Sequence, residues 1–202
     1  MKTRVLLTGF GPFAGVDINP TEVLIQRIAS LDFPGIELNT QVLEVSYRRS
    51  SEQVKTLVHA TKPELVIHMG VARSTPYLRG ETQAVNLKAS DLPDMDGERG
   101  LGNSVDSHDE PGTVRHSHYD VLGLVSAFEQ EGFPAQLSQD AGRYVCNAVY
   151  YQSLRMLEHT DVNCFFLHVP AVDAFWTIER QLRAIVFMLT RLGKTGPSHA
   201  IS

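Results

Sequence analysis

Short apolar runs alternate with segments of helical periodicity along the first third of the chain. Residues 4–8 and 65–71 are mainly apolar runs typical of buried strands, and residues 36–45 alternate as a strand does. Between them, the apolar residues of 20–31 and of 51–60 recur at helical spacing. The predicted order is strand, helix, strand, helix, strand, which is typical of a mostly parallel sheet with helices on both faces.

The second half of the chain continues this pattern. Apolar residues recur at helical spacing over 121–128, over 146–157 and over 178–192, where they form a long stripe. Two segments, 133–137 and 163–169, have the length and composition of strands. We therefore expect these elements to extend the same layered arrangement.

The middle of the chain is less regular. Residues 72–80 are predicted to form a loop, and residues 83–87 a short strand. Residues 89–118 are rich in Asp, Gly, Pro and Ser, so we expect a functional loop or a mobile lid there.

The first predicted helix carries a clear start signal. Asn19 is suited to cap it, with Pro20 at its first position and Glu22 placed to complete a capping box. The strand before it is expected to break at Gly9, where a glycine-containing loop begins.

Composition narrows the class of protein. The chain has 202 residues, 43% of them hydrophobic, and we expect residues 1–202 to form a single domain with a sizeable core. A net charge of -5 and a pI near 5.9 provide no basic surface for nucleic acid or acidic lipid. We expect no nucleic-acid partner and no membrane partner.

The cysteine content and the apolar runs indicate the compartment. Only Cys146 and Cys164 occur, too few for a disulfide framework, and the N-terminal apolar run is too short for a signal peptide. No apolar stretch approaches the roughly 18 residues that a membrane span needs. We therefore expect a cytoplasmic protein with free thiols.

A polar turn that contains glycine places Cys146 in the first turn of a predicted helix. There the helix dipole and the unpaired backbone N–H groups favour a thiolate, and the same N–H groups can bind an oxyanion. This is the setting of a nucleophilic cysteine. A buried structural cysteine is the alternative interpretation.

A nucleophilic thiol needs a base, and the base needs an acceptor that orients it. His168 stands at the carboxyl end of a predicted strand, at the edge of the sheet where the Cys146 turn is expected to emerge. Glu81 and Asp140 are both suited by location to orient its imidazole. The residues alone leave that choice open.

The remaining histidines are less suited to catalysis. His68 lies within an apolar strand, and His159 closes a helix, where a cation is favourable. The irregular segment holds a further group of histidines and acids, namely Asp106, His108, Asp109, Glu110, His116 and His118. No predicted helix or strand fixes their geometry and no cysteine joins them, so we favour a solvated loop over a metal site.

Glycines and phenylalanines alternate after the first strand. Gly9, Gly11 and Gly15 do not fit the spacing of a dinucleotide-binding or phosphate-binding loop, so we expect no phosphate site. Phe10 and Phe13 lie at the carboxyl end of a strand, where open α/β sheets commonly bind ligands. They are candidates for the wall of a binding slot, and plugging the core is the alternative.

Four motifs together resemble the pyroglutamyl peptidase I (pyrrolidone-carboxylate peptidase) family of cysteine peptidases. They are GFGPF at 9–13 with Asn19-Pro20, ETQAVN at 81–86, SQDAGRYVCN at 138–147, and His168-Val169-Pro170. Their order and their spread over nearly the whole chain make the resemblance specific. It implies an α/β fold, a three-layer α/β/α sandwich with an open, twisted, mostly parallel mixed sheet, in agreement with the predicted elements.

The resemblance also implies roles for individual residues. Cys146 is implied to be the nucleophile, His168 the base and Glu81 the acid that orients it. Phe10, Phe13 and Val145 are implied to line a slot for the pyrrolidone ring, with Asn19 supporting the loop and Leu92 closing the slot. The family uses no cofactor and no metal.

The implied activity is removal of N-terminal pyroglutamate (5-oxoproline) from peptides through a thioester acyl-enzyme. The resemblance further suggests a homo-oligomer, a tetramer or a dimer. Tyr77 and Leu78 are apolar residues of a predicted loop that could contribute to a subunit contact.

Three positions depart from the family pattern. Thr75, Thr82 and Asp91 stand where the resemblance implies arginines. These changes motivate two alternatives: a related Cys-His-Glu amidase or acyl transferase with altered acyl specificity, and an inactive binding paralogue. The intact triad argues against the second alternative.

Overall fold

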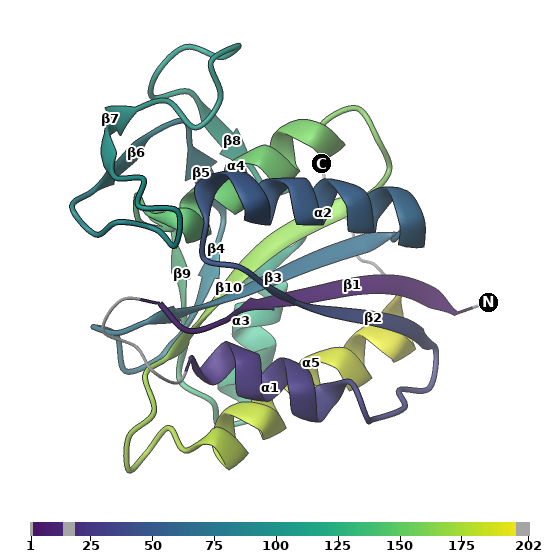
Figure 1. Cartoon of the computed structure of the whole chain (residues 1–202). Helices are drawn as coiled ribbons and strands as arrows, with labels where there is room; N and C mark the ends of the chain where they lie inside the picture. Colours follow the sequence, from purple (N-terminus) through teal and green to yellow (C-terminus); the bar gives the residue numbers. More distant parts are fainter. Residues whose placement is uncertain (1, 14–18, 197–202) are drawn as a thin grey trace.

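The computed structural model describes residues 2–13 and 19–196. Its centre is a six-stranded sheet with helices on both faces (Figure 1). Across the sheet the strand order is β2-β1-β3-β10-β4-β9. The strands are β1 (Thr3–Phe10), β2 (Ile36–Leu43), β3 (Leu65–Ala72), β4 (Leu78–Glu81), β9 (Ala135–Ser138) and β10 (Asn163–Pro170).

The sheet is mixed, as predicted. Strands β1, β2, β3 and β10 run parallel to one another, β4 is antiparallel to β10, and β9 is parallel to β4. The reversal of β9 corrects one expectation. The segment that leads to Cys146 does not leave the sheet at the carboxyl ends of the parallel strands, and residues 139–144 return the chain to that end.

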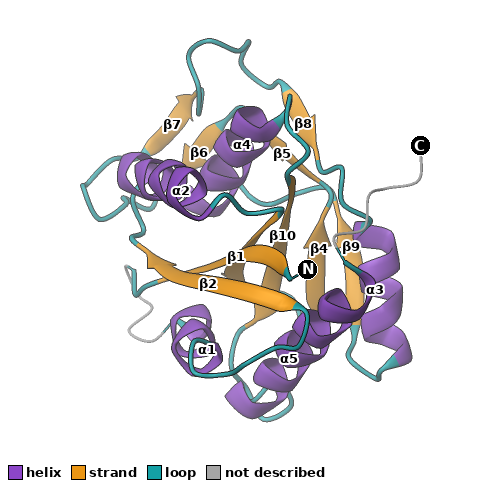
Figure 2. Ribbon diagram, turned by 90° about the vertical axis from the view of Figure 1, so that its right-hand side faces the viewer, coloured by secondary structure: helices purple, strands orange, loops and turns teal. Residues whose placement is uncertain are grey.

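Helices cover both faces of the sheet, which confirms the three-layer α/β/α arrangement (Figure 2). One face carries α2 (Tyr47–Thr61) and α4 (Val145–Leu157). The other carries α1 (Pro20–Ile28), α3 (Val121–Gln130) and α5 (Ile178–Thr195). No helix among the described residues is both long enough and apolar enough to cross a membrane.

Alternate residues of β1 pack into the hydrophobic cores on the two faces of the sheet. Val5 and Leu7 belong to the core under α1, α3 and α5, whereas Leu6 and Phe10 belong to the core under α2 and α4. A strand buried on both faces has apolar residues at consecutive positions, because each face needs its own set. This is why a short apolar run predicts the strand correctly.

Strand β1 continues through Gly9 to Phe10, so the predicted break at Gly9 is wrong. A β-carbon on Gly9 would lie 2.8 Å from the Thr21 carbonyl oxygen and 2.9 Å from Ile25 Cγ1. The glycine therefore allows α1 to pack directly on the strand. Asn19 caps α1 as predicted, with its side chain accepting the Thr21 N–H at 3.1 Å.

Two elements differ from the pattern-based prediction. Helix α2 begins at Tyr47 rather than near residue 51, because the Ser46 hydroxyl caps it by accepting the Arg49 N–H at 3.0 Å. Strand β4 begins at Leu78, inside residues 72–80, which were expected to form a loop. Its pairing partners β9 and β10 come from much later in the chain, so its own four residues give little sign of it.

Residues 83–118 form an excursion at the end of the sheet where β1 finishes (Figure 1). It contains two small antiparallel sheets, β5 (Gln83–Val85) with β8 (Val114–His116), and β6 (Lys88–Ser90) with β7 (Gly100–Asn103). The short strand predicted over 83–87 is confirmed by β5, whereas β7 and β8 lie within residues 89–118, where an irregular loop was expected.

The side chain of Asn86 connects two parts of this excursion by hydrogen bonds. Its buried side chain donates to the carbonyl oxygens of Asp106, Asp109 and Glu110, at 2.9, 2.9 and 3.1 Å. Its Oδ1 accepts the Asp106 N–H at 2.8 Å. One amide thus fixes the backbone of residues 106–110, which argues against the predicted mobile lid at this point.

Candidate active site

Cys146 lies in the first turn of α4, as the sequence predicts. Its side chain is partly exposed, whereas Cys164 on β10 is only 2% exposed. The sulfur lies against Gly70 on β3, where a β-carbon would stand 2.8 Å from Cys146 Sγ. The absence of a side chain at Gly70 therefore makes room for the sulfur above the sheet.

His168 stands beside Gly70 in the sheet. The two are register partners on the parallel strands β10 and β3, so position 168 projects toward the face that carries α4. His168 is 6% exposed and lines the same cavity as Cys146. The two candidate reacting groups therefore lie over neighbouring points of the sheet.

Glu81 reaches His168 from β4. His168 Nδ1 lies 2.8 Å from Glu81 Oε1, and Glu81 is fully buried. A carboxylate can only accept hydrogen bonds, so Nδ1 carries the proton of this contact and Nε2 is left as the basic nitrogen. Of the two acids that the sequence left open, Glu81 is the one beside the imidazole.

Asp140 shapes the turn before α4. Its Oδ1 accepts the Gly142 N–H at 3.1 Å and the Arg143 Nη1 at 2.5 Å. Its side chain is 68% exposed, and its partners all belong to the turn itself. These contacts fit a structural role in presenting Cys146.

Arg79 is a site residue that the sequence analysis missed. Its Nε lies 3.2 Å from Glu81 Oε1, and the side chain lines the cavity with Cys146 and His168. Residues two apart on a strand project from the same face, so β4 places Arg79 and Glu81 side by side. Residues 72–80 were predicted to form a loop, and in a loop two residues at this spacing are not expected to share a face.

A cavity of about 300 Å³ opens beside these residues. Phe10, Phe13, Asn19 and Val145 all line it, as the resemblance implies. Phe10 is 2% exposed and packs into the core, whereas Phe13 is more exposed and its ring lies 6.1 Å from that of Tyr144. The two alternatives for Phe10 thus coexist, since it fills the core and also contributes to the wall.

Leu92 is not brought to the cavity. It lies in the turn after β6, where its N–H donates to Ser90 Oγ at 3.2 Å, and its side chain is 46% exposed. This part of the chain contacts the cavity wall through Tyr144, whose hydroxyl donates to the Pro93 carbonyl oxygen at 2.9 Å. The expectation that Leu92 closes the slot is therefore corrected.

The surroundings of Cys146 raise the pKa of its thiol. Burial and then the negative charge of Glu81 raise the pKa of the Cys146 thiol to about 12, and the backbone N–H at the helix start lowers it by less. Burial therefore opposes the thiolate that the helix start was expected to favour. Attack on a carbonyl then requires a base that removes the thiol proton.

The start of α4 provides backbone donors. Tyr144, at the N-cap, makes no side-chain capping hydrogen bond. The first N–H groups of a helix have no partner within the helix, and the dipole favours negative charge there. These groups are suited to an oxyanion that forms next to Cys146.

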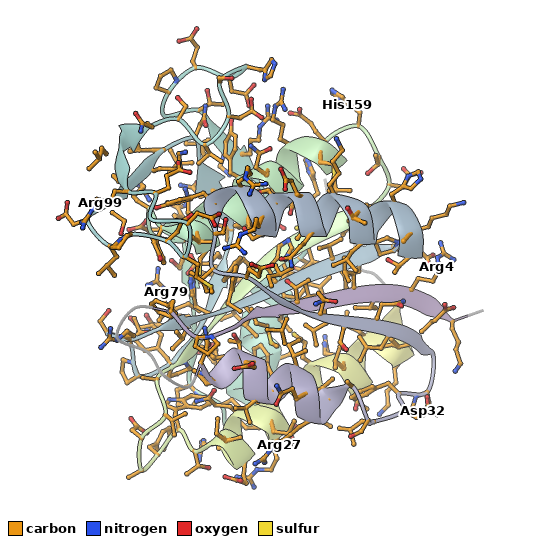
Figure 3. All side chains as sticks on the ribbon, in the orientation of Figure 1. Arg4, Arg27, Asp32, Arg79, Arg99 and His159 are labelled. Carbon is orange, nitrogen blue, oxygen red and sulfur yellow. The ribbon has the colours of Figure 1, made fainter. Side chains whose placement is uncertain are left out.

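The other two histidines considered above take no part in the site. His68 is fully buried, with Nδ1 2.7 Å from Thr8 Oγ1 and Nε2 2.9 Å from Ser153 Oγ. Burial lowers the pKa of His68 to about 3, so it is a neutral core residue. His159 is 93% exposed and lies far from Arg79 in Figure 3.

Two acids of the group considered as a metal site, Asp106 and Asp109, pair with arginines. Asp106 accepts from Arg155 at 2.8 Å and contacts His108 at 2.9 Å, and Asp109 accepts from Arg115 at 2.8 Å. Within the described ranges, no group of three or more His, Cys, Asp or Glu side chains is placed to hold a metal ion.

The three departures from the family pattern make local contacts, and that of Asp91 is through its carbonyl oxygen, which accepts from Arg99 Nη1. Thr82 donates its N–H and its hydroxyl to the Ser138 carbonyl oxygen, at 2.8 and 3.1 Å, and so joins β4 to the segment before Cys146. Thr75 closes a turn onto Ala72. The cation beside Glu81 comes from Arg79, not from these positions.

Comparison with known proteins decides the family. The sequence profile of the family described as pyroglutamyl peptidase matches residues 3–184. The chain belongs to the pyroglutamyl peptidase family. The resemblance inferred from four motifs is thereby confirmed.

Other members of the pyroglutamyl peptidase family match most of the chain. A pyrrolidone-carboxylate peptidase of Oceanobacillus iheyensis is 30% identical over 174 residues, covering 83% of this chain and 84% of that protein. One of Halalkalibacterium halodurans is 32% identical over 179 residues, covering 85% of each. The pyrrolidone carboxyl peptidase of Fervidobacterium islandicum superimposes with a TM-score of 0.87 at 30% identity, covering 96% of this chain and 99% of that chain. The predicted fold of a pyroglutamyl peptidase is thereby confirmed.

Proposed function

We propose that this chain is a pyroglutamyl peptidase I-like cysteine exopeptidase, which removes N-terminal pyroglutamate (5-oxoproline) from peptides. The observation that carries the proposal is the 2.8 Å contact between His168 Nδ1 and the buried Glu81, beside a cysteine at a helix start. Family membership supports the same activity, since the matched relatives bear the name pyrrolidone-carboxylate peptidase. Cys146 is then the nucleophile.

Acylation begins with a proton transfer. His168 Nε2 takes the thiol proton as Cys146 Sγ attacks the carbonyl carbon that joins pyroglutamate to the next residue. The carbonyl oxygen becomes an oxyanion, which the backbone N–H groups at the start of α4 stabilise. The C–N bond then breaks, the imidazolium gives its proton to the leaving amine, and a pyroglutamyl thioester remains on Cys146.

Deacylation uses the same base. His168 takes a proton from water, and the hydroxide attacks the thioester carbonyl. The C–S bond breaks, the sulfur recovers its proton from the imidazolium, and free pyroglutamate leaves. Glu81 accepts the Nδ1 hydrogen bond throughout and stabilises the imidazolium in both steps.

The cavity suits a neutral ring. Pyroglutamate has no free amino group, so its recognition needs apolar walls and a few hydrogen bonds rather than a charged pocket. Phe10, Phe13 and Val145 supply apolar wall. Asn19 supports the loop that carries Phe13, because its Nδ2 donates to the Gly11 carbonyl oxygen at 3.1 Å.

The proposal includes a cellular setting and an assembly. A single domain over residues 1–202 would act in the cytoplasm on peptide substrates, without cofactor, metal, nucleic acid or membrane; the two free thiols fit a reducing compartment. A homo-oligomer, a tetramer or a dimer, is also proposed. Leu78 is fully buried in the core, so it is not available for the subunit contact for which it was a candidate, whereas Tyr77 is partly exposed.

Fluorogenic amides of pyroglutamate, glutamine, proline and alanine test the proposal. Glutamine is the open-chain counterpart of pyroglutamate and proline its counterpart without the ring carbonyl, so both are matched controls. Selective release from the pyroglutamyl amide is expected. Faster cleavage of another amide would identify a related amidase or acyl transferase, and cleavage of none would indicate an inactive binding paralogue. Either of these results contradicts the proposal.

A further inference from the structure

The guanidinium group of Arg79 contacts both the Glu81–His168 pair and the segment that precedes Cys146. Arg79 Nε lies 3.2 Å from Glu81 Oε1, the oxygen that also contacts His168 Nδ1. At its other end, Arg79 Nη2 donates to Ser138 Oγ and to the Asp140 carbonyl oxygen, both at 2.5 Å. Ser138 and Asp140 belong to the segment that leads into Cys146.

The negative charge of the buried Glu81 carboxylate needs a compensating positive charge, which Arg79 provides. Glu81 is fully buried, and its Oε2 has no hydrogen-bond partner among the described residues. An ionised carboxylate in such a place is costly unless an opposite charge compensates it. When the imidazole of His168 is neutral, the Arg79 guanidinium is the positive group in direct contact with the carboxylate.

We propose that Arg79 is a positioning residue for the reaction assigned above. It stabilises the negative charge of Glu81, which orients His168, and it fixes residues 138–140 relative to that pair. This inference rests on the proposed function for its kinetic consequence, although its electrostatic consequence exists without any substrate. Arg79 itself exchanges no proton and forms no bond with the reacting atoms.

The sign of the pH effect follows from the charge. The reaction needs an unprotonated imidazole beside an ionised carboxylate, and a nearby cation disfavours a proton on either group. Loss of the cation makes the Glu81–His168 pair take up its proton at a higher pH, whichever of the two groups carries it. Among the described residues, the other titratable or charged groups that face the pair or line its cavity are Cys146, Tyr144, Tyr150, Arg73 and Asp140.

Three variants separate the electrostatic role from a purely structural one. Arg79→Met keeps much of the side-chain length and removes the charge. Arg79→Lys keeps the charge and loses the fork of hydrogen bonds. Ser138→Ala removes one contact at the far end and leaves the contact with Glu81 untouched. Melting temperatures of all three identify any variant that fails to fold.

On the pyroglutamyl amide, Arg79→Met is expected to lower kcat about 10-fold to 100-fold, the range found for residues that orient metal ligands through hydrogen bonds. Its acidic limb of kcat against pH is expected at higher pH than in the wild type. Arg79→Lys should keep the wild-type acidic limb and recover part of the rate. Ser138→Ala should keep the acidic limb as well.

The decisive experiment needs no substrate: an NMR titration of the His168 ring, assigned with His168→Asn. The midpoint is expected to rise in Arg79→Met and to stay near the wild-type value in Arg79→Lys and Ser138→Ala. An unchanged midpoint in folded Arg79→Met, or an equal rise in Arg79→Lys, would overturn the inference. A rise in a protein that cleaves none of the amides would instead support the role of Arg79 in the pair and contradict the proposed function alone.

Discussion

Cys146 Sγ and Gly70 are in close contact across the space between α4 and β3. A β-carbon on Gly70 would lie 2.8 Å from the sulfur and 2.9 Å from Cζ of the fully buried Phe166. Neither neighbour is the free end of a flexible surface side chain, so an added methyl group must displace the sulfur or the core. The contact links the sequence of a sheet strand directly to the position of the nucleophile.

Gly70→Ala is therefore expected to lower kcat on the pyroglutamyl amide by about 10²-fold, because a displacement near 1 Å at a reacting atom has that effect. Overpacking should also reduce the free energy of unfolding by roughly 1–3 kcal/mol. Steady-state kinetics and thermal denaturation measure the two effects. Gly11→Ala is the control, since its β-carbon would meet its nearest neighbours at 3.8 Å, an ordinary contact. Equal activity of Gly70→Ala and wild type would show that the sulfur need not be where the structure places it.

Replacing the two candidate acids tests which one orients His168. Glu81→Gln keeps the shape of the side chain and removes the charge that stabilises the imidazolium, so kcat should fall ~10²-fold to 10³-fold. Its melting temperature should change little, because Arg79 keeps its contacts with Ser138 and Asp140. Asp140→Asn should mainly destabilise the turn before α4. A stable, nearly inactive Asp140→Asn beside a Glu81→Gln within about threefold of wild type would reverse the assignment.

Alkylation by iodoacetamide reports the protonation state of the thiol. Cys146 should react before the buried Cys164, and activity should fall in step with its modification. The pKa of Cys146 is raised to about 12, so the reactive thiolate is a small fraction at pH 7 that grows as pH rises. The labelling rate should therefore increase steadily between about pH 7 and pH 10. A plateau above neutral pH would mean that a thiolate already exists in the free protein, and Glu81→Gln should label faster because it removes one cause of the raised pKa.

The elements with strong local signals are predicted well from the sequence. The apolar run of β1, the Asn19 cap of α1 and the helical spacing after Cys146 depend on neighbouring residues, and all three are present. Cys146 and His168 could be selected because a thiol at a helix start and a histidine at a strand end are recognisable from local sequence. The choice of Glu81 over Asp140 came from the family resemblance, and the 2.8 Å contact with His168 now supports it.

What the sequence does not reveal depends on partners distant in the chain. Strand β4 has four residues and is formed by pairing with β9 and β10, so neither it nor the proximity of Arg79 and Glu81 has a local signal. The raised pKa of the Cys146 thiol also depends on residues distant in the chain. A helix start favours a thiolate, but the burial that raises the pKa is produced by the assembled core. Leu92 was placed in the slot by resemblance alone, and the turn that follows β6 directs it elsewhere.

Cys146 is proposed to be the nucleophile that releases pyroglutamate. The chain has two cysteines, so removing the sulfur of each in turn gives a matched pair. The most direct measurement is the rate of pyroglutamate release from a pyroglutamyl amide by Cys146→Ala and by Cys164→Ala, each verified as folded. No detectable release is expected from Cys146→Ala, and substantial release is expected from Cys164→Ala. Sustained release by a folded Cys146→Ala protein would contradict the proposal.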